Sequence, residues 1–82
     1  MGRSYTLMFR WDGDADKCPT DDFYDDITTE SMAELEEFYS KHQSSEWLFN
    51  MLEVEDDDGE YATARFGPMP GQSLRSFIND MM

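Results

Sequence analysis

The most restrictive feature of this sequence is a run of acids, because such a run can fold only where water reaches it. Residues 53–60, EVEDDDGE, place six acids in eight positions. At a spacing of ~6 Å each pair of like charges costs roughly 0.7 kcal/mol in water, so several pairs are a sizeable fraction of a small domain's stability. Asp58-Gly59 is a strong signal for a tight hairpin turn. The run therefore predicts a solvated hairpin tip between a strand over 46–55 and a strand over 61–68.

Two further segments frame this hairpin. Residues 4–11, SYTLMFRW, alternate between apolar and polar side chains and predict a half-buried strand. Its apolar face would carry Tyr5, Leu7, Phe9 and Trp11. Residues 12–26 contain seven aspartates and no periodicity, which predicts a long loop. The strand over 46–55 has apolar residues on both faces, as a central strand does. Its two predicted faces are Trp47, Phe49 and Met51 against Leu48, Asn50, Leu52 and Val54.

Two helices are predicted from apolar residues at helical spacing. The first covers 27–43, and its apolar stripe is Met32, Leu35, Phe38, Tyr39 and His42. Two starts for this helix remain open. Either Thr28 or Thr29 is the N-cap with Ile27 packing on Met32, or Ser31 and Glu34 form a capping box. The second helix covers 72–82, and its stripe is Leu74, Phe77, Ile78 and Met81.

These elements follow one another in the order β-α-β-β-α. The simplest packing is an α+β fold, a three-stranded antiparallel sheet with two helices packed on one face. A chain of 82 residues is expected to form one domain, residues 1–82. Hydrophobic residues make up 39% of it, which is more than a disordered acidic tail carries.

The charge balance restricts the possible partners. Nineteen acids against six bases give a net charge of −13. Such a field repels nucleic acid and anionic membranes, and it attracts cationic surfaces. No apolar run approaches the thickness of a bilayer, and the N-terminal residues lack the apolar core of a signal peptide. Cys18 is the only cysteine, so an internal disulfide is impossible. We expect a cytoplasmic protein.

No arrangement of residues in this sequence predicts catalysis. His42 is the only histidine, and its place near the end of an apolar helix stripe indicates packing or a contact with the helix C-terminus. Cys18 lies among aspartates, which disfavour the thiolate and make it a poor nucleophile. We therefore expect that the protein is not an enzyme and uses no cofactor.

Calcium binding is an alternative of a different class. Asp12, Asp14 and Asp16 have the spacing of the first ligands in a calcium loop. However, Lys17 stands where that loop requires glycine, and Phe23 stands where it requires glutamate. The acids of 56–58 would be a second place for such a low-affinity calcium-binding module.

The acids fall into two dense groups. Residues 12–37 contain eleven acids and one lysine, and residues 53–60 contain six acids. A charge of −13 on 82 residues exceeds what solubility requires, and further like charge only destabilises the compact state. Duplex DNA carries one charge per ~1.7 Å of axis. A rigid domain with carboxylates along a loop, a helix and a hairpin tip could present a comparable density to a cationic groove.

In size, charge and compact α+β layout the chain resembles the small acidic inhibitor proteins of phages and mobile elements. These include DNA-mimic anti-restriction and anti-CRISPR proteins and uracil-DNA glycosylase inhibitors. The resemblance implies an inhibitor that binds the basic nucleic-acid-binding surface of a bacterial defence effector, such as a CRISPR complex, in the host cytoplasm. An immunity protein for a toxic nuclease is one alternative. A regulatory or structural domain that binds through its sheet, with Phe49, Met51 and Tyr61, is another.

The predicted contact residues for the inhibitor are acids of both groups and two neighbouring tyrosines. The acids would pair with lysines and arginines of the partner, and the tyrosines would supply packing anchors. The predicted set is Asp21, Asp22, Tyr24, Asp25, Asp26, Glu30, Glu34, Glu37, Asp56, Asp57, Asp58, Glu60 and Tyr61.

Overall fold

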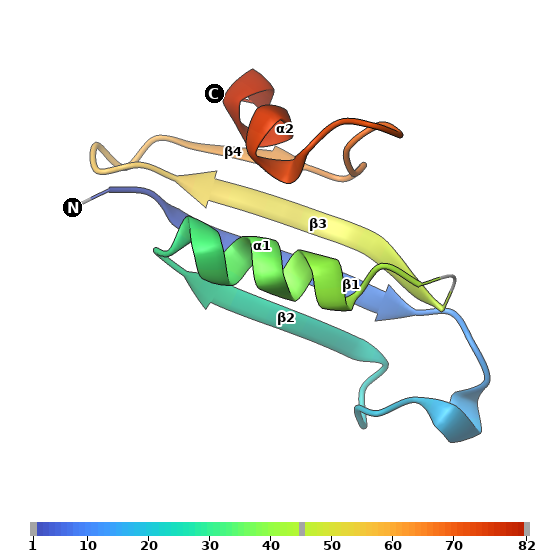
Figure 1. Ribbon diagram of the computed structural model, residues 1–82. Coiled ribbons are helices and arrows are strands. Elements are labelled where there is room, and N and C mark those ends of the chain that lie inside the picture. The colour runs from blue at the N-terminus through green and yellow to red at the C-terminus, as the bar shows by residue number, and fades with distance from the viewer. Residues whose placement is uncertain (1, 45, 82) are drawn as a thin grey trace.

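The computed structural model of this protein describes residues 2–44 and 46–81 (Figure 1). Its elements in chain order are β1 (Ser4–Trp11), a short 3-10 helix η1 (Ala15–Lys17), β2 (Tyr24–Thr29), α1 (Met32–Lys41), β3 (Trp47–Glu55), β4 (Tyr61–Ala64) and α2 (Leu74–Met81). The strands form one antiparallel sheet in the order β2-β1-β3-β4. The fold is α+β with the order β-β-α-β-β-α, and β2 and β4 are its edge strands.

The sheet has four strands, so the prediction of three strands is wrong. The additional strand is β2, which was expected to be the end of a loop and the first turn of a helix, and it pairs with β1 along its whole length. The side chains that β2 turns toward the helices are those of Asp25, Ile27 and Thr29, which are half-buried. Only Ile27 is apolar, so the alternation of this strand hardly appears in a hydrophobicity pattern.

The turn from β2 into α1 is held by a cluster of polar side chains. Ser31 is the N-cap of α1, and its Oγ accepts a hydrogen bond from the Glu34 N–H at 3.2 Å. The capping box is therefore confirmed at its Ser31 position. The alternative prediction, an N-cap at Thr28 or Thr29 with Ile27 packing on the helix start, is wrong. All three residues belong to β2. Thr29 Oγ1 instead accepts from the Ser31 N–H at 3.0 Å and donates to Glu34 Oε1 at 2.7 Å.

A β-bulge at Asn50 decides which side chains of β3 point inward. Met51 pairs with Met8, but Phe49 pairs with Phe9, so Asn50 is an extra residue in the ladder. An extra residue reverses the alternation beyond it. The β3 side chains that pack against the core are Trp47, Phe49, Leu52 and Val54. The predicted faces of this strand assumed unbroken alternation and are wrong.

The core lies between the sheet and the two helices. Its most deeply buried side chains come from β1, β3, α1 and α2: Leu7, Phe9, Leu35, Leu52, Val54 and Ile78. Full burial of one such side chain contributes about 1.5–3 kcal/mol. Helix α1 packs against β1 and β2, and α2 packs against β4 (Figure 1). Glu36 of α1 and Arg75 of α2 join the helices with an ion pair of 3.0 Å. The inner face of β1 agrees with the prediction, since Tyr5, Leu7 and Phe9 are buried.

The remaining elements are shorter than predicted. Strand β4 ends at Ala64, before the segment with Gly67 and Pro68. Helix α2 begins at Leu74 after Ser73, whose Oγ accepts from the Ser76 N–H at 3.1 Å. The last predicted residue of this helix, Met82, lies outside the described residues. No helix within 2–44 and 46–81 combines the length and apolarity needed to cross a membrane.

Candidate functional site

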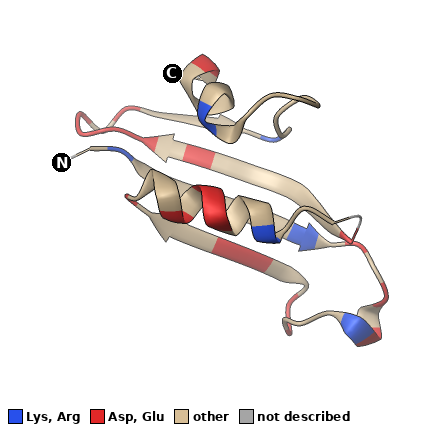
Figure 2. Cartoon of the chain, in the orientation of Figure 1, with Lys and Arg blue, Asp and Glu red and all other residues tan. Residues whose placement is uncertain are grey.

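Six of the seven predicted contact acids of the first group lie just before, on or just after β2, an edge strand, or on α1. Two precede the strand, one is on it, one is in the turn that follows, and two are on α1. All six carboxylates belong to exposed residues. We call this set the acidic edge: Asp21, Asp22, Asp26, Glu30, Glu34 and Glu37. Figure 2 shows the acidic segments of β2 and of α1 on neighbouring parts of the ribbon. The side chain of Asp26 faces the side of the sheet opposite α1.

Helix α1 divides its glutamates between two sides. Glu34 and Glu37 line a shallow hollow together with Ile27 of β2, so these two glutamates are on the side of α1 that faces β2. Glu36 turns the other way, toward Arg75. Lys41 shares the hollow and lies 3.0 Å from Glu37, where it compensates part of the negative charge. An exposed pair at this helical spacing contributes only about 0.3–0.5 kcal/mol.

The predicted contact residues of the second group lie together at the tip of the β3–β4 hairpin. Asp56 has a structural task there, because its Oδ1 accepts hydrogen bonds from the N–H groups of Asp58 and Glu60 at 3.0 and 3.1 Å. Asp57 Oδ1 accepts from the Gly2 N–H. Gly59 has a φ of 84°, which side chains with a Cβ rarely adopt. The tip is therefore a turn held in shape by hydrogen bonds. The exposed carboxylates of Asp58 and Glu60 are its charges most available to a binding partner.

The acidic edge and the hairpin tip meet at one end of the sheet. Thr29 of β2 and Val54 of β3 both pair with Tyr5 of β1. Glu30 and Asp56 therefore follow strands that finish at the same end of the sheet, on either side of β1. Strands separated by one neighbour lie about 10 Å apart. The nineteen acids are not all gathered here. Those outside the two sets are Asp12, Asp14, Asp16, Asp25, Glu36, Glu46, Glu53, Glu55 and Asp80.

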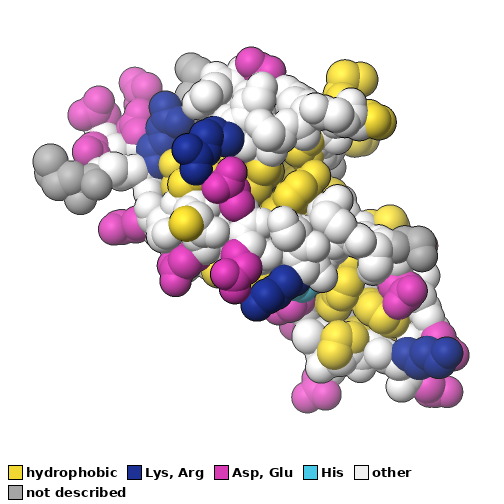
Figure 3. Space-filling view, in the orientation of Figure 1, with side chains coloured by type: hydrophobic (Ala, Val, Ile, Leu, Met, Phe, Trp, Pro, Cys, Tyr) yellow, Lys and Arg dark blue, Asp and Glu magenta, His cyan; other side chains and the backbone are white. Residues whose placement is uncertain are grey.

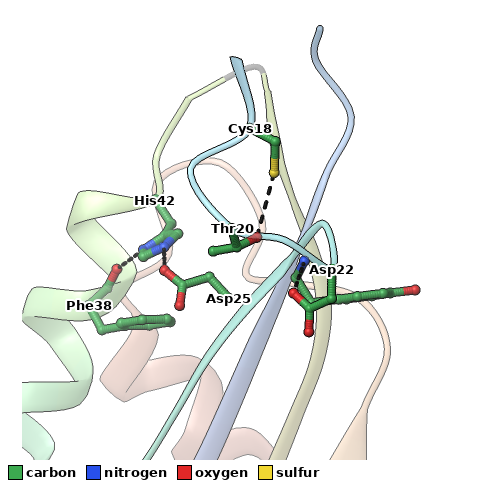
Figure 4. A network of polar contacts seen from close by, with 7 residues as sticks. Cys18, Thr20, Asp22, Asp25, Phe38 and His42 are labelled. Atoms are coloured by element: carbon green, nitrogen blue, oxygen red, sulfur yellow. Dashed lines mark hydrogen bonds and ion pairs between the residues drawn. The ribbon is translucent and has the colours of Figure 1, made fainter. Parts of the chain in front are cut away.

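Asp25 is turned away from the acidic edge by a bond to His42 (Figure 4). Asp25 Oδ2 lies 2.7 Å from His42 Nε2, and the Phe38 carbonyl oxygen lies 2.8 Å from His42 Nδ1. The residue His42 is 7% exposed, and its imidazole stacks on Phe9 with ring centroids 4.9 Å apart. His42 is also the C-cap of α1. The predicted packing and helix-end roles of His42 are thus confirmed, but its link to Asp25 was not predicted.

The partners of His42 limit its chemistry. A carbonyl oxygen only accepts, so Nδ1 must carry a proton. Nε2 is held by the Asp25 carboxylate, with Oδ2 at 2.7 Å. Neither ring nitrogen is left to take a proton from a substrate, which is what a general base must do. The pair instead ties β2 to the end of α1. The only sequence signal for this pair was an acid, Asp25, seven residues before Met32, the first residue of the predicted helix stripe.

The two predicted tyrosine anchors do not lie together. Tyr24 is 40% exposed and pairs with Arg10 on the sheet face opposite the helices. Tyr61 is 68% exposed and begins β4, the other edge strand. Tyr24 therefore accompanies the acidic edge and Tyr61 accompanies the hairpin tip. Phe49 and Met51, expected to bind together through the sheet, are separated by the bulge, because Phe49 packs under the helices.

The calcium motif and the cysteine lie at the opposite end of β1 from the tip. Asp14 caps η1 by accepting from the Asp16 N–H at 3.0 Å. Within the described part of the chain, no three acids, histidines or cysteines are grouped closely enough to hold a metal ion. Cys18 is half-buried, and its Sγ lies 3.5 Å from Thr20 Oγ1 (Figure 4). Neither feature supplies a second candidate site.

Comparisons of the chain with protein-family models, with curated proteins and with solved structures returned no match.

Proposed function

We propose that this protein is an acidic inhibitor that uses the acidic edge to occupy the basic nucleic-acid-binding surface of a bacterial defence effector, such as a CRISPR complex. The observation that carries the proposal is a group of six exposed carboxylates around one edge strand, β2, and the helix that follows it. A charged surface of this kind binds a basic groove by releasing its counterions, as nucleic acid does. The groove is then closed to its substrate.

The length and fixed position of the acidic edge support imitation of one phosphate strand. The six residues of β2 span about 20 Å, and the residues that flank the strand extend the row to roughly 30 Å. Six charges over this length are one per about 5–6 Å, which is sparser than the 3.4 Å per phosphate of one strand of duplex DNA. Hydrogen bonds of Ser31 and Thr29 hold the turn from β2 to α1, so these charges lie on a fixed scaffold.

The hairpin tip extends the same surface. Asp58 and Glu60 lie at the end of the sheet where Glu30 lies, and they can contact a second part of the partner. Complementary charge chiefly raises the association rate and selects the partner. An immunity protein for a toxic nuclease would use the same surface, and the identity of the partner distinguishes the two readings.

A competition assay tests this function. Labelled single-stranded and duplex nucleic acid is bound to purified CRISPR effector complexes and to toxic nucleases, and the protein is then added. We expect stoichiometric release that weakens steeply between about 50 and 200 mM salt, because several charges participate. If no effector or nuclease releases its nucleic acid at low salt, the proposed function is wrong.

Two matched variants locate the surface. Asp21→Lys with Glu30→Lys reverses two charges of the acidic edge, and Asp16→Lys with Asp80→Lys reverses two charges outside it. Both variants change the net charge by the same amount. We expect the first to lose inhibition and the second to keep most of it. Equal loss in both would mean that net charge acts without a defined site.

A further inference from the structure

A cavity of about 540 Å³ opens at the C-terminal end of α1, between β1, β3 and residues 67–68. This volume is within the usual range for small-ligand sites, about 300–1,000 Å³. Five aromatic side chains line it: Phe9, Tyr39, His42, Trp47 and Phe49. Gln43 and Ser44 add polar groups. Figure 3 shows hydrophobic side chains between the two helices and beyond the end of α1, on the side from which the helices are seen.

The rings are arranged around Phe9, which lies at the bottom of the cavity and is 2% exposed. The ring centroids of Tyr39 and Phe49 lie 6.2 and 6.1 Å from that of Phe9. His42 stacks on Phe9, and Trp47 meets His42 edge-on with centroids 5.1 Å apart. Tyr39, Trp47 and Phe49 are half-buried, so they present the accessible aromatic surface. Several aromatic rings around one opening attract a cation through their quadrupoles.

The charges near the cavity also favour a cation. Among the described residues that line it there is no lysine or arginine, and the Lys41 ammonium is directed to Glu37 at the acidic edge. Both nitrogens of His42 are already bonded. The C-terminus of α1 carries the negative end of the helix dipole. Glu46 precedes Trp47 in the chain, and its carbonyl oxygen accepts from the Asp12 N–H. Glu46 thus adds an acid to this end of the sheet, where Asp12 is paired with Arg10 at 3.9 Å.

We propose that this cavity receives the guanidinium group of an arginine side chain from the partner protein. A guanidinium is planar, stacks on aromatic rings and is less strongly hydrated than an ammonium group. Gln43 Nε2 donates to the Tyr39 carbonyl oxygen at 3.0 Å, and the Oε1 of the same amide is an acceptor for a guanidinium N–H. The proposal rests on the proposed function, since arginine is a principal residue of nucleic-acid-binding surfaces, and it adds one anchor to the diffuse attraction of the acidic edge.

Titration with two small probes tests this site. N-acetyl-arginine methylamide carries the guanidinium, and N-acetyl-citrulline methylamide is its neutral analogue of nearly the same shape. Amide and aromatic NMR spectra of the full chain report where each probe binds. We expect the arginine probe to shift resonances of Tyr39, Trp47 and Phe49, and the citrulline probe to leave them unchanged. Equal shifts from both probes, or arginine-induced shifts confined to the acidic edge, would overturn the proposal.

Variants give a second measure of the same site. Tyr39→Leu removes one ring and should weaken the arginine probe about threefold, the effect of one partly exposed cation–π contact. Tyr61→Leu removes an exposed ring at the start of β4, which does not line the cavity, and should leave the affinity for the arginine probe unchanged. Ser44→Arg leaves every ring in place and puts a competing guanidinium at the opening, so it should weaken the probe as well. Unchanged affinity in the folded Ser44→Arg protein would contradict the site.

The test of the arginine site can fail or succeed independently of the test of the proposed function. Asp21→Lys with Glu30→Lys should abolish inhibition of the effector and retain binding of the arginine probe in the cavity. A protein that inhibits but gives no cavity shifts would refute the arginine site alone. A protein that gives the shifts but releases no nucleic acid from any effector would refute the proposed function, and with it the assignment of the arginine to a nucleic-acid-binding partner.

Discussion

Replacing Asp25 with alanine should destabilise the protein by about 1.5–2 kcal/mol. The hydrogen bond from Asp25 to His42 is short, at 2.7 Å, and involves a carboxylate, and bonds to charged groups contribute about 1.5–3 kcal/mol. The lower part of this range applies, because the Asp25 side chain is 38% exposed and water partly replaces it. His42 is nearly buried, so its Nε2 would lose its partner in a place that water reaches poorly.

Asp26 provides the matched control for this change. It is the next residue on β2, it is exposed, and it faces the other side of the sheet. Asp26→Ala removes the same charge from a protein of net charge −13, so relief of general repulsion is the same in both variants. Exposed substitutions of this kind usually change stability by less than about 0.5 kcal/mol. The difference between the two variants therefore isolates the bond to His42.

Thermal unfolding followed by circular dichroism measures the effect. For a domain of this size 1 kcal/mol corresponds to about 4–8 °C in Tm, so Asp25→Ala should melt roughly 6–16 °C below Asp26→Ala. Asp25→Asn should fall between them, because its Nδ2 can donate to Nε2 of a neutral imidazole. Equal melting temperatures for Asp25→Ala and Asp26→Ala would show that the pair does not stabilise the fold.

Three other substitutions test separate parts of the fold. Leu52→Ala removes a fully buried core side chain and should cost about 2–5 kcal/mol in urea unfolding; a cost below that range would mean the core closes around the gap. Ser31→Ala removes the N-cap of α1 and should cost about 1 kcal/mol, seen as a lower urea midpoint. Asp56→Ala removes two hydrogen bonds of the hairpin turn and should lower Tm, while Asp58→Ala should not; the reverse order would refute the assigned role of Asp56.

Predictions that depended on neighbouring residues in the chain agree with the structure. The alternation of SYTLMFRW placed β1 and its inner face correctly, and Asp58-Gly59 placed the hairpin. Four of the six acids of residues 53–60 lie at the hairpin tip, where water lowers the cost of crowding like charges. The spacing of the apolar residues in both helices also agrees, since Leu35, Leu74 and Ile78 are buried.

The errors arose where a partner distant in the chain decides the structure. Strand β2 turns Asp25 toward the core, and this is tolerable only because His42, at the far end of α1, bonds to it. The bulge at Asn50 appears only in the pairing of β3 with β1, so no alternation within β3 alone could reveal it. Thr29 looked like a helix cap because its hydroxyl does bond near the start of α1, although its backbone belongs to β2.

The features of the candidate sites also fall into two groups, those that the sequence determines and those that only the tertiary structure determines. Composition by itself determined that the protein is strongly acidic, lacks an internal disulfide and has a solvated acidic turn, because these properties depend only on residue types and short spacings. Only the tertiary structure decided which carboxylates gather at the sheet edge, because β2 pairs with β1 as an edge strand and α1 packs beside it, while Asp25 and Glu36 turn to His42 and Arg75. It also brought Phe9, Tyr39 and Phe49 around one cavity, since rings from two strands and a helix meet only when the sheet and α1 pack together.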